Sequence, residues 1–486
     1  MSKKKKTIEE LLEEAVVPEE EQPYEVPTNW VWVKLGTVTK FINGDRGKNY
    51  PSQKEFIESG IPFVNAGHIQ NGNINMSKMN YISNEKYNSL GSGKIVKNDI
   101  LYCLRGTLGK TAIVREIEKG AIASSLVILR PHIHIINSYL YFYLISHLGM
   151  SMISLHDNGS AQPNLSANNV KKYVFPLPPF NEQKRIAEKV ECLLRKIEDA
   201  KQLIEEAKET FELRYKSILK KALNGELTKK WRESESDSIS AYEHIQNAYN
   251  ELKQNYEEKC LNAKIEKKPK PKRPEIFKHF SLKDNSVDGL SKWVKTTFIH
   301  LCVLQRGFDL PVQNRIDGNY PIVSAGGIID SHNEFKVKGA GVTTGRSGTI
   351  GSVFYIEENY WPLNTSLYVD YFNGNNPKYV YYYLLNFDFK TYSSSTAVPT
   401  LNRNNFFDVE VKIPPKKEQD IIVEILDEFF DKETESFKFI EQLGGNLETL
   451  KQSILSKAFR GELGTNDPSE GNAIELLKDV LQEQVK

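Results

Sequence analysis

The chain has few cysteines and no long apolar run. Its 486 residues hold four cysteines, which lie far apart without a Cys-x-x-Cys pair: Cys103, Cys192, Cys260 and Cys302. This usage argues against structural zinc and a disulfide scaffold, and it predicts a reducing, cytoplasmic location. No apolar segment approaches the roughly 20 residues that span a bilayer. The basic Met1–Lys6 leads into the acidic Thr7–Ala15, where a signal peptide would be apolar, so we do not expect secretion.

The chain also lacks an overall excess of charge of one sign. Its formal net charge is +1, which by itself does not indicate a nucleic-acid binder. The distribution is uneven, because Val26–Phe175 holds 16 Lys and Arg against 8 Asp and Glu, whereas Ser286–Ile413 holds 11 against 11. The first region is therefore basic enough to face phosphates, and charge alone would not identify the second as a DNA binder.

Complete catalytic motifs are missing as well. Gly109-Lys110-Thr111 ends like a phosphate-binding loop, but Leu104 stands where that loop needs a glycine, so we expect a turn between strands. Leu177-Pro-Pro-Phe180 lacks the polar first residue with which DNA amino-methyltransferases hold their target amine, and no glycine-rich turn for S-adenosylmethionine is present. His132-x-His134 has no further ligand at metal-binding spacing. A carboxylate-and-lysine nuclease site stays open, because its signature is too short to be specific.

What the sequence does contain is an internal repeat. A shift of 236 residues aligns Ser160–Leu227 with Thr396–Leu463 without a gap, and 23 of the 68 pairs are identical. The identities include a Pro-Pro pair, a Glu-Gln pair and a terminal Gly-Glu-Leu. Weaker echoes lie upstream, where Trp32-Val-Lys34 resembles Trp293-Val-Lys295 and Arg105-Gly-Thr-Leu-Gly109 resembles Ser347-Gly-Thr-Ile-Gly351. The chain thus holds two units, each a globular domain followed by an element of fixed length.

That element is predicted to be a long helix with an apolar stripe in heptad spacing, typical of a coiled coil. Arg214 interrupts the first stripe, and Glu433 and Ser436 interrupt the second. The first stripe is Ile186, Val190, Leu193, Ile197, Ala200, Ile204, Ala207, Phe211 and Ile218. The second is Ile422, Leu426, Phe429, Ile440, Leu443, Leu447, Leu450 and Ile454. The Pro-Pro pairs suit helix starts and Gly225 and Gly461 suit helix ends, whereas Gly444-Gly445 could kink the second helix.

The globular parts are predicted to be mixed α and β. Short β-branched and aromatic runs predict strands at 30–35, 61–64, 122–129, 349–355 and 367–371. Short helices are expected at 139–147 and 379–385, and longer ones at 241–263 and 473–484. We divide the chain into an N-terminal helix and lead-in (1–25), a first domain (26–178), a first long helix (179–229), a helix and basic linker (230–285), a second domain (286–413), a second long helix (414–463) and a C-terminal helix (464–486).

The duplicated units, the Pro-Pro-x-x-Glu-Gln helix starts and the Gly-Glu-Leu helix ends resemble the specificity subunit of type I restriction–modification systems. The resemblance covers nearly the whole chain. It implies an α+β fold with two target-recognition domains, separated by two long antiparallel coiled-coil helices in a pseudo-twofold repeat. Each domain would read one half of a bipartite, asymmetric double-stranded DNA target. The helices would set the spacer and dock two methyltransferase subunits, and two restriction subunits would join them.

The same resemblance implies that this chain has no catalytic, cofactor or metal site of its own. S-adenosylmethionine would belong to the methyltransferase subunits, and ATP with Mg²⁺ to the restriction subunits. Candidate DNA contacts are loop residues that recur between the copies. Among such residues, Arg and Lys can bind guanine, and Gln or Asn can bind adenine. The candidates are Arg105, Thr107, Lys110, Ser160, Gln162, Asn164, Arg346, Ser347, Thr349, Thr396 and Thr400. Lys48, Arg306 and Arg403 are weaker candidates for phosphate contacts.

Three alternatives stay open at this point. The candidate contacts fit turn and helix-cap roles equally well. The chain could be a two-headed coiled-coil adaptor for protein partners, which the neutral second domain would suit. It could also be a self-contained modification enzyme whose active site has no known motif. The basic run Lys267–Arg273 is either a solvated tether or a nucleic-acid contact.

Overall fold

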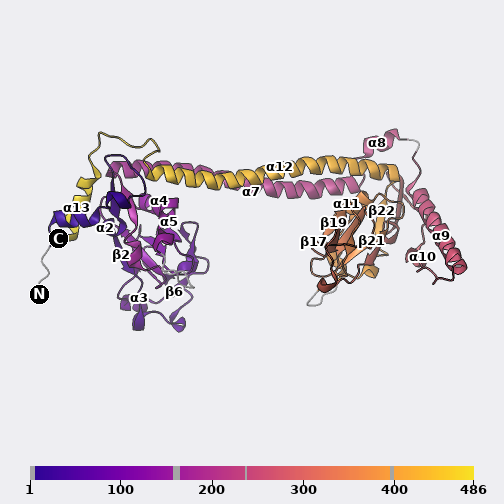
Figure 1. Cartoon of the computed structure of the whole chain (residues 1–486), viewed down its shortest axis with the longest axis horizontal. Coiled ribbons are helices and arrows are strands. Elements are labelled where there is room, and N and C mark those ends of the chain that lie inside the picture. Colours follow the sequence, from indigo (N-terminus) through magenta and orange to yellow (C-terminus); the bar gives the residue numbers. More distant parts are fainter. Residues whose placement is uncertain (1–5, 157–164, 236–237, 394–398, 486) are drawn as a thin grey trace. The chain divides into compact units, whose positions relative to one another are not determined.

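The structure is a computed structural model that describes residues 6–156, 165–235, 238–393 and 399–485. The chain forms two compact units, which are described separately. Unit 1 consists of Met1–Glu205 and Glu441–Lys486, and unit 2 of Glu206–Ile440. Each unit combines a mixed α and β domain with one part of each long helix (Figure 1). The mixed fold and the two long helices expected from the sequence are confirmed.

Unit 1 holds the N-terminal and C-terminal elements of the chain. Its helices and short 3-10 turns are α1 (Ile8–Ala15), η1 (Glu19–Glu21), α2 (Leu35–Val38), η2 (Gly47–Asn49), η3 (Gln53–Glu55), η4 (Ala66–His68), α3 (Asn84–Ser89), α4 (Asn137–Ile145), α5 (His147–His156), α6 (Ala167–Val170) and α13 (Ala473–Val485). Its strands are β1 (Val31–Lys34), β2 (Thr39–Asn43), β3 (Ile61–Val64), β4 (Ile69–Gln70), β5 (Asn73–Ile74), β6 (Asn80–Ile82), β7 (Lys94–Ile95), β8 (Ile100–Cys103), β9 (Thr111–Ile113), β10 (Gly120–Ile122), β11 (Leu126–Pro131) and β12 (Val174–Leu177).

Unit 2 holds the domain that lies between the two long helices in sequence, together with part of each helix. Its helices and 3-10 turns are α8 (Lys229–Ser234), α9 (Ala241–Ile265), α10 (Ile276–His279), η5 (Phe298–His300), η6 (Val312–Asn314), α11 (Pro377–Asn386), η7 (Phe389–Tyr392) and η8 (Arg403–Asn405). Its strands are β13 (Ser286–Val287), β14 (Leu290–Thr297), β15 (Val303–Arg306), β16 (Tyr320–Ser324), β17 (Gly327–His332), β18 (Gly341–Gly345), β19 (Val353–Ile356), β20 (Trp361–Pro362), β21 (Ser366–Tyr371) and β22 (Glu410–Ile413).

The sheets of the two units follow the same order. In unit 1 an antiparallel sheet runs β2-β11-β8-β9, and in unit 2 its counterpart runs β15-β21-β18-β19. Next to it, β3 pairs antiparallel with β6 and parallel with β10, as β16 pairs with β17 and β20. The pairs β1-β12 and β14-β22 complete the correspondence and lead into the long helices.

The long helices are α7 (Phe180–Leu223) and α12 (Lys416–Phe459), each of 44 residues. Their apolar stripes are most buried where they join a domain core. In unit 1, Ile186 and Val190 share a core with Leu455 and Ala458, and in unit 2, Leu219 and Ala222 share one with Ile422 and Leu426. The middle of the stripe is more open, since Leu443 and Leu450 are 38% and 49% exposed. Helix α12 continues through Gly444-Gly445.

The charged interruptions of the two stripes contact each other. An Arg214 guanidinium nitrogen lies 2.7 Å from a carboxylate oxygen of Glu433, and the same guanidinium lies over the rings of Phe211 and Phe429. Beside this pair, Tyr215 stacks on Phe430. The two charged interruptions, one in each stripe, are therefore the two halves of one ion pair within unit 2.

Glycine ends both long helices, as expected. Gly225 and Gly461 each have φ of +74°, a conformation that is costly for residues with a Cβ. In the first case the Glu226 N–H donates to the Lys221 carbonyl and the Gly225 N–H donates to the Ala222 carbonyl, with the same pattern at Gly461. This is the Schellman motif, which satisfies the last carbonyls of a helix.

Some local expectations were wrong. Region 122–129 is two strands, β10 and β11, because the chain turns at 123–125, and the strand expected from 349 begins only at Val353. The match of Trp32 with Trp293 was also wrong by two residues. Val31 pairs with Leu177 as Val294 pairs with Ile413, so Trp30 corresponds to Trp293. Across the described ranges, no helix combines the length and apolarity needed to cross a bilayer.

Candidate nucleic-acid interface

A groove of about 560 Å³ lies at one edge of the main sheet of the first domain. Strands β2 and β8 both run antiparallel to β11, so their final residues lie at the same edge. The following loops therefore bring Arg46 and Arg105 to one groove, and both side chains are exposed. Asp45 lies there too, but its carboxylate accepts the N–H groups of Arg46 and Gly91 at 2.7 and 2.6 Å. It shapes the loop that presents the two guanidinium groups.

The segment before α7 closes this groove. The Leu165 N–H donates to the Leu104 carbonyl at 3.0 Å, which places Ser166 and Asn168 in the lining. Lys48 is exposed two residues beyond Arg46. Lys48 and Arg105 were predicted as contacts from the sequence, whereas Arg46 was not, because only the sheet order places its loop beside Arg105.

Lys110 lines a different hollow, of about 1070 Å³. The lining comes from the β4–β5 hairpin, α4 and both long helices, and it includes Lys201, Lys451 and Glu198. Between Arg105 and Lys110 the chain makes a tight turn with Gly106 and Gly109 at φ of +81° and +76° and with Thr107 exposed. The turn expected in place of a phosphate-binding loop is therefore confirmed, and it separates the two cations rather than pairing them.

In the second domain, the corresponding edge presents Arg306 at the end of β15. Its guanidinium is exposed and lies 3.6 Å from the Asp309 carboxylate. Arg403 is held more firmly, because it donates to the Leu304 carbonyl and to the Gln305 side chain and lies 4.0 Å from the Glu275 carboxylate. Arg403 therefore connects structural elements, and Arg306 is the freer of the two cations.

The remaining candidates of the second domain lie on two paired segments. Arg346 is half-buried, and its guanidinium donates to the Asn364 carbonyl at 3.4 Å. The Leu401 N–H donates to the Arg346 carbonyl, and Ser347 forms a β-bridge with Thr400. Thr349 is exposed in the turn that follows. Ser160, Gln162, Asn164 and Thr396 lie outside the described residues.

A third groove, of about 490 Å³, joins the inter-domain linker to the second domain. It is lined by Lys272 and Arg273 from the linker and by Gln305, Arg306, Phe308, Tyr368 and Asp370 from the domain. Burial raises the pKa of the Asp370 carboxyl, while a hydrogen bond from Tyr368 and the charges of Lys272 and Arg403 act in the opposite direction. The groove therefore combines two linker cations with a partly desolvated acid.

The repeated Glu-Gln pair attaches each long helix to its own domain. In unit 1, Glu182 is fully buried and accepts the indole N–H of Trp30 at 2.7 Å and the amide of Asn466 at 2.9 Å. Burial raises the pKa of this carboxyl against the effect of those hydrogen bonds. Gln183 accepts the Ile136 N–H at 3.0 Å and donates to the His134 carbonyl.

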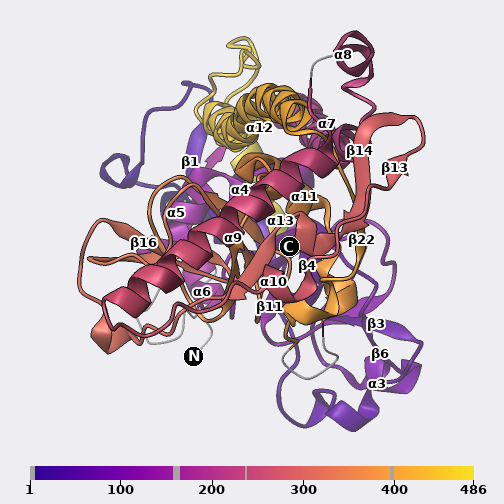
Figure 2. The same cartoon turned by 90° about the vertical axis from the view of Figure 1, so that its right-hand side faces the viewer.

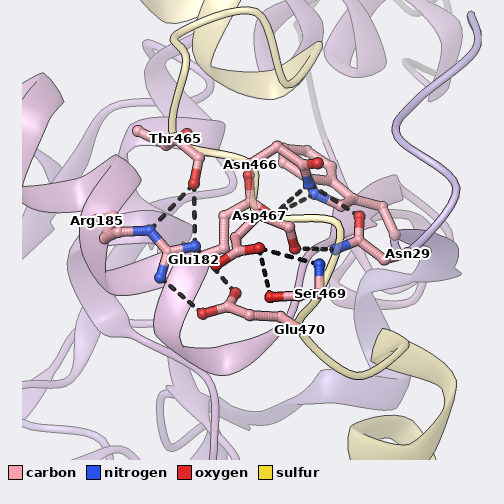
Figure 3. A network of polar contacts seen from close by, with 9 residues as sticks. Asn29, Glu182, Arg185, Thr465, Asn466, Asp467, Ser469 and Glu470 are labelled. Carbon is pink, nitrogen blue, oxygen red and sulfur yellow. Dashed lines mark hydrogen bonds and ion pairs between the residues drawn. The ribbon is translucent and has the colours of Figure 1, made fainter.

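Figure 3 shows how the segment after α12 completes this junction in unit 1. The Arg185 guanidinium donates to both carboxylate oxygens of Glu470, at 2.8 and 2.9 Å, and to the Thr465 carbonyl. The Asn466 amide also donates to the Asn29 side chain. The repeated Glu-Gln pair is visible in the sequence, but its role could not be predicted, because the Trp30 and Asn466 donors lie far away along the chain.

Unit 2 has the same junction with different donors. Glu418 accepts the Trp293 indole N–H at 2.7 Å and the Thr228 hydroxyl at 2.6 Å, and it pairs with the Arg232 guanidinium. Gln419 accepts the Asn376 N–H at 2.8 Å. Both units therefore fix the start of a long helix against the domain that precedes it.

Within the described ranges, no group of three or more His, Cys, Asp or Glu side chains is placed so that it could hold a metal ion. His134 instead packs its ring edge-on against Phe180.

Comparison with known proteins identifies the family. The sequence model of the type I restriction modification DNA specificity domain matches residues 27–209 and 300–443. The chain is 28% identical over 217 residues to the type I restriction enzyme EcoKI specificity subunit of Escherichia coli (strain K12), covering 43% of this chain and 46% of that protein. It is 30% identical over 218 residues to the EcoBI specificity subunit of Escherichia coli, covering 44% and 45%. The chain thus spans about half the length of these two relatives.

A third relative and two solved structures match over more of the chain. The StySPI specificity subunit of Salmonella potsdam is 25% identical over 471 residues, 90% of each chain. A chain solved to explain complex assembly and conformational transition of the type I R-M system has a TM-score of 0.64 at 18% identity, over 91% of this chain and all of that one. The HsdS subunit from Thermoanaerobacter tengcongensis gives 0.51 at 18% identity, with the same coverage. These structures share the fold, and because the family model matches well over half of the residues, the chain belongs to the type I restriction modification DNA specificity family.

Proposed function

We propose that this chain is the DNA-recognition subunit of a type I restriction–modification complex and catalyses no reaction itself. The observation that carries the proposal is that one chain holds two domains with the same sheet order, and that the family's sequence model matches in both. Two related but non-identical binding domains suit a target made of two different half-sites. The relatives named as specificity subunits support this role.

The long helices would set the distance between the half-sites. Each has 44 residues, and at 1.5 Å per residue such a helix is about 66 Å long, close to two turns of duplex DNA. We propose that they form an antiparallel coiled coil with pseudo-twofold symmetry, matching the pseudo-dyad of the duplex. Two methyltransferase subunits would dock on the equivalent outer faces, and two restriction subunits would join this assembly.

Chemistry would then belong to the partners. The methyltransferase subunits would bind S-adenosylmethionine, and the restriction subunits would use ATP with Mg²⁺. This chain would bind the DNA target and align the partner subunits on it, in the cytoplasm. An exposed cation such as Arg105 or Arg306 could bind phosphate or a guanine edge, whereas Arg346 and Arg403 would act by holding the loops in place.

A domain exchange tests the proposal. Replacing Ser286–Ile413 by the matching segment of a relative should change one half of the methylated sequence and leave the other half and the spacer as they were. The reciprocal exchange of 26–178 is the matched control and should change only the opposite half. The readout is sequencing of methylated sites in DNA treated with the complex of chain and methyltransferase. A change of both half-sites after a single exchange would contradict the two-domain proposal, and methylation by the isolated chain would indicate a self-contained enzyme.

A further inference from the structure

The inter-domain linker carries a concentrated run of positive charge. Lys267-Lys-Pro-Lys-Pro-Lys-Arg273 places five cations in seven residues, and all five side chains are exposed. Lys268 pairs with Glu266 at 2.7 Å. Among the described residues, the other four cations take part in no ion pair. The two prolines lack an N–H group, so the run cannot continue helix α9.

The run is not a free tether, because both of its flanks are attached to unit 2. Before it, the Tyr256 hydroxyl of α9 donates to the Pro271 carbonyl at 3.3 Å. After it, Ile276 is 1% exposed, and Phe280 stacks on Tyr249 with 3.6 Å between ring centroids. Helices α9 and α10 accordingly lie on the same side of this unit, at its right in Figure 1 and toward the viewer in Figure 2. Contacts on both flanks therefore fix the position of the basic run relative to unit 2.

The end of the basic run lies in the groove next to Arg306. Lys272 and Arg273 line it together with Gln305 and Arg306 of β15. This groove runs along β15 and β21, whereas the Arg46 and Arg105 groove of the first domain lies beyond the ends of β2 and β8. An ionised Asp370 would repel an anion there, but the positive charges of Lys272 and Arg403 act on the same site and offset that repulsion. The linker therefore adds cations beside Arg306, an exposed guanidinium of the second domain that lies 3.6 Å from the Asp309 carboxylate.

The difference in net charge between the two domains indicates a function for the basic run. The first domain has a surplus of eight cations over Val26–Phe175, whereas Ser286–Ile413 has none. We propose that Lys267–Arg273 is a phosphate-binding arm of the second domain, supplying the contacts to duplex DNA that the domain itself lacks. This inference rests on the proposed function, since it presupposes that the second domain binds DNA. The arm would strengthen binding without reading bases, because phosphates carry no sequence information.

Salt dependence of binding tests the arm. The complex of full chain and methyltransferase is titrated with duplex DNA carrying its methylated target, from low to high salt. Replacing all five cations together should lower the slope of log K against log salt by about 0.9 for each phosphate that the arm no longer neutralises, and weaken binding about fivefold per phosphate near 0.15 M salt. The variant is Lys267→Gln, Lys268→Gln, Lys270→Gln, Lys272→Gln and Arg273→Gln. Both methylated half-sites should stay the same.

Two matched variants make the result specific. Removing five exposed lysines elsewhere in unit 2 changes the net charge equally and should leave the slope nearly unchanged: Lys229→Gln, Lys230→Gln, Lys253→Gln, Lys259→Gln and Lys283→Gln. Replacing the four arm lysines by arginine keeps the charge and should keep the slope. Arg105→Gln with Lys110→Gln in the first domain is a comparison variant whose slope should also fall if those residues contact phosphate.

The outcomes separate the arm from the proposed function. If the unmodified complex does not bind DNA, the proposed function fails. If it binds and the arm variant keeps the full slope, or the matched lysine variant loses as much, the arm inference is wrong. Loss of methyltransferase from the arm variant, seen by native mass spectrometry, would also overturn it, because the run would then be a protein-docking element.

Discussion

Glu182 and Glu418 occupy corresponding positions at the starts of the two long helices, yet their surroundings differ. Both are fully buried, and both accept an indole N–H at 2.7 Å, from Trp30 and Trp293 respectively. Around Glu182 the second donor is a neutral amide, from Asn466. Around Glu418 the further donors are a hydroxyl and the Arg232 guanidinium, whose side chain is only 12% exposed.

The difference shows which part of the junction the fold requires. The tryptophan and the carboxylate occur in both units, and they join the helix to the sheet. The segments after the helices differ, since the chain from Gly225 continues into α8 with Arg232, whereas the chain from Gly461 continues into a loop with Asn466. One junction therefore compensates its buried charge with an ion pair, and the other relies on hydrogen bonds and a raised carboxyl pKa.

Neutralising the two glutamates should have unequal effects on stability. Glu418→Gln leaves the Arg232 charge in a nearly dry site, which typically costs 3–5 kcal/mol, and the slight exposure of Arg232 favours a cost of about 3 kcal/mol. Glu182→Gln strands no bonded cation, and the amide can still accept from Trp30, so a cost of about 1 kcal/mol or less is expected. Hydrogen exchange of the β1–β12 and β14–β22 amides measures each unit separately.

A double substitution tests whether the unpaired Arg232 charge causes the loss of stability at the Glu418 site. Combining Glu418→Gln with Arg232→Met removes both charges, so most of the lost stability should return. Equal costs of Glu182→Gln and Glu418→Gln would contradict the comparison. Failure of the double substitution to recover stability would indicate that packing, and not the buried charge, dominates this junction.

The pH dependence of unit 1 should show a smaller effect. Burial raises the folded-state pKa of Glu182 above its unfolded value, so the folded state binds the proton more tightly. The resulting stabilisation is fully present below the unfolded pKa and is lost as the pH rises through the folded pKa. Between neutral pH and the ordinary carboxyl range, wild-type unit 1 should therefore gain stability relative to Glu182→Gln as the pH falls. Hydrogen exchange at pH 7.5 and 5 measures this, corrected for the intrinsic rate, and an unchanged difference would contradict it.

Features with local causes could be predicted from the sequence, and those that depend on sheet order could not. The long helices, their glycine ends and the turn at Gly109 follow from periodicity and from glycine's access to positive φ. The partnership of Trp30 with Glu182 could not be predicted, because 152 residues separate them. The same holds for the groove of Arg46 and Arg105, which exists because β2 and β8 flank β11. The two-residue shift between the tryptophans could not be predicted either, since Trp32-Val-Lys34 matches Trp293-Val-Lys295 in all three residues, whereas the true counterpart, Trp30-Val-Trp32, matches in only two.

The smallest effect concerns the ion pairs between the long helices. In unit 2, Arg214 and Glu433 meet within the apolar stripe, with the Glu433 carboxylate side chain only 17% exposed, whereas in unit 1 the carboxylate side chain of the Lys201–Glu448 pair, at 3.1 Å, is 54% exposed. Exposed pairs contribute about 0.2–1 kcal/mol. We expect a double-mutant cycle to give a coupling near 0.5–1 kcal/mol for Arg214–Glu433 and close to zero for Lys201–Glu448.

Two multiple substitutions sharpen this last comparison. Exchanging the charges, Arg214→Glu with Glu433→Arg, should restore most of the coupling, since the attraction does not depend on which helix carries the cation. Replacing both residues by leucine completes the two apolar stripes, and it should leave the free energy of unfolding unchanged or raise it, as for other partly buried pairs. Denaturant unfolding followed by circular dichroism measures both. A large loss of stability in the double-leucine chain would mean that Arg214 and Glu433 stabilise the pairing of the helices beyond what their partial burial predicts. Their interruption of the apolar stripe would then be a requirement of the fold, and not a tolerated exception.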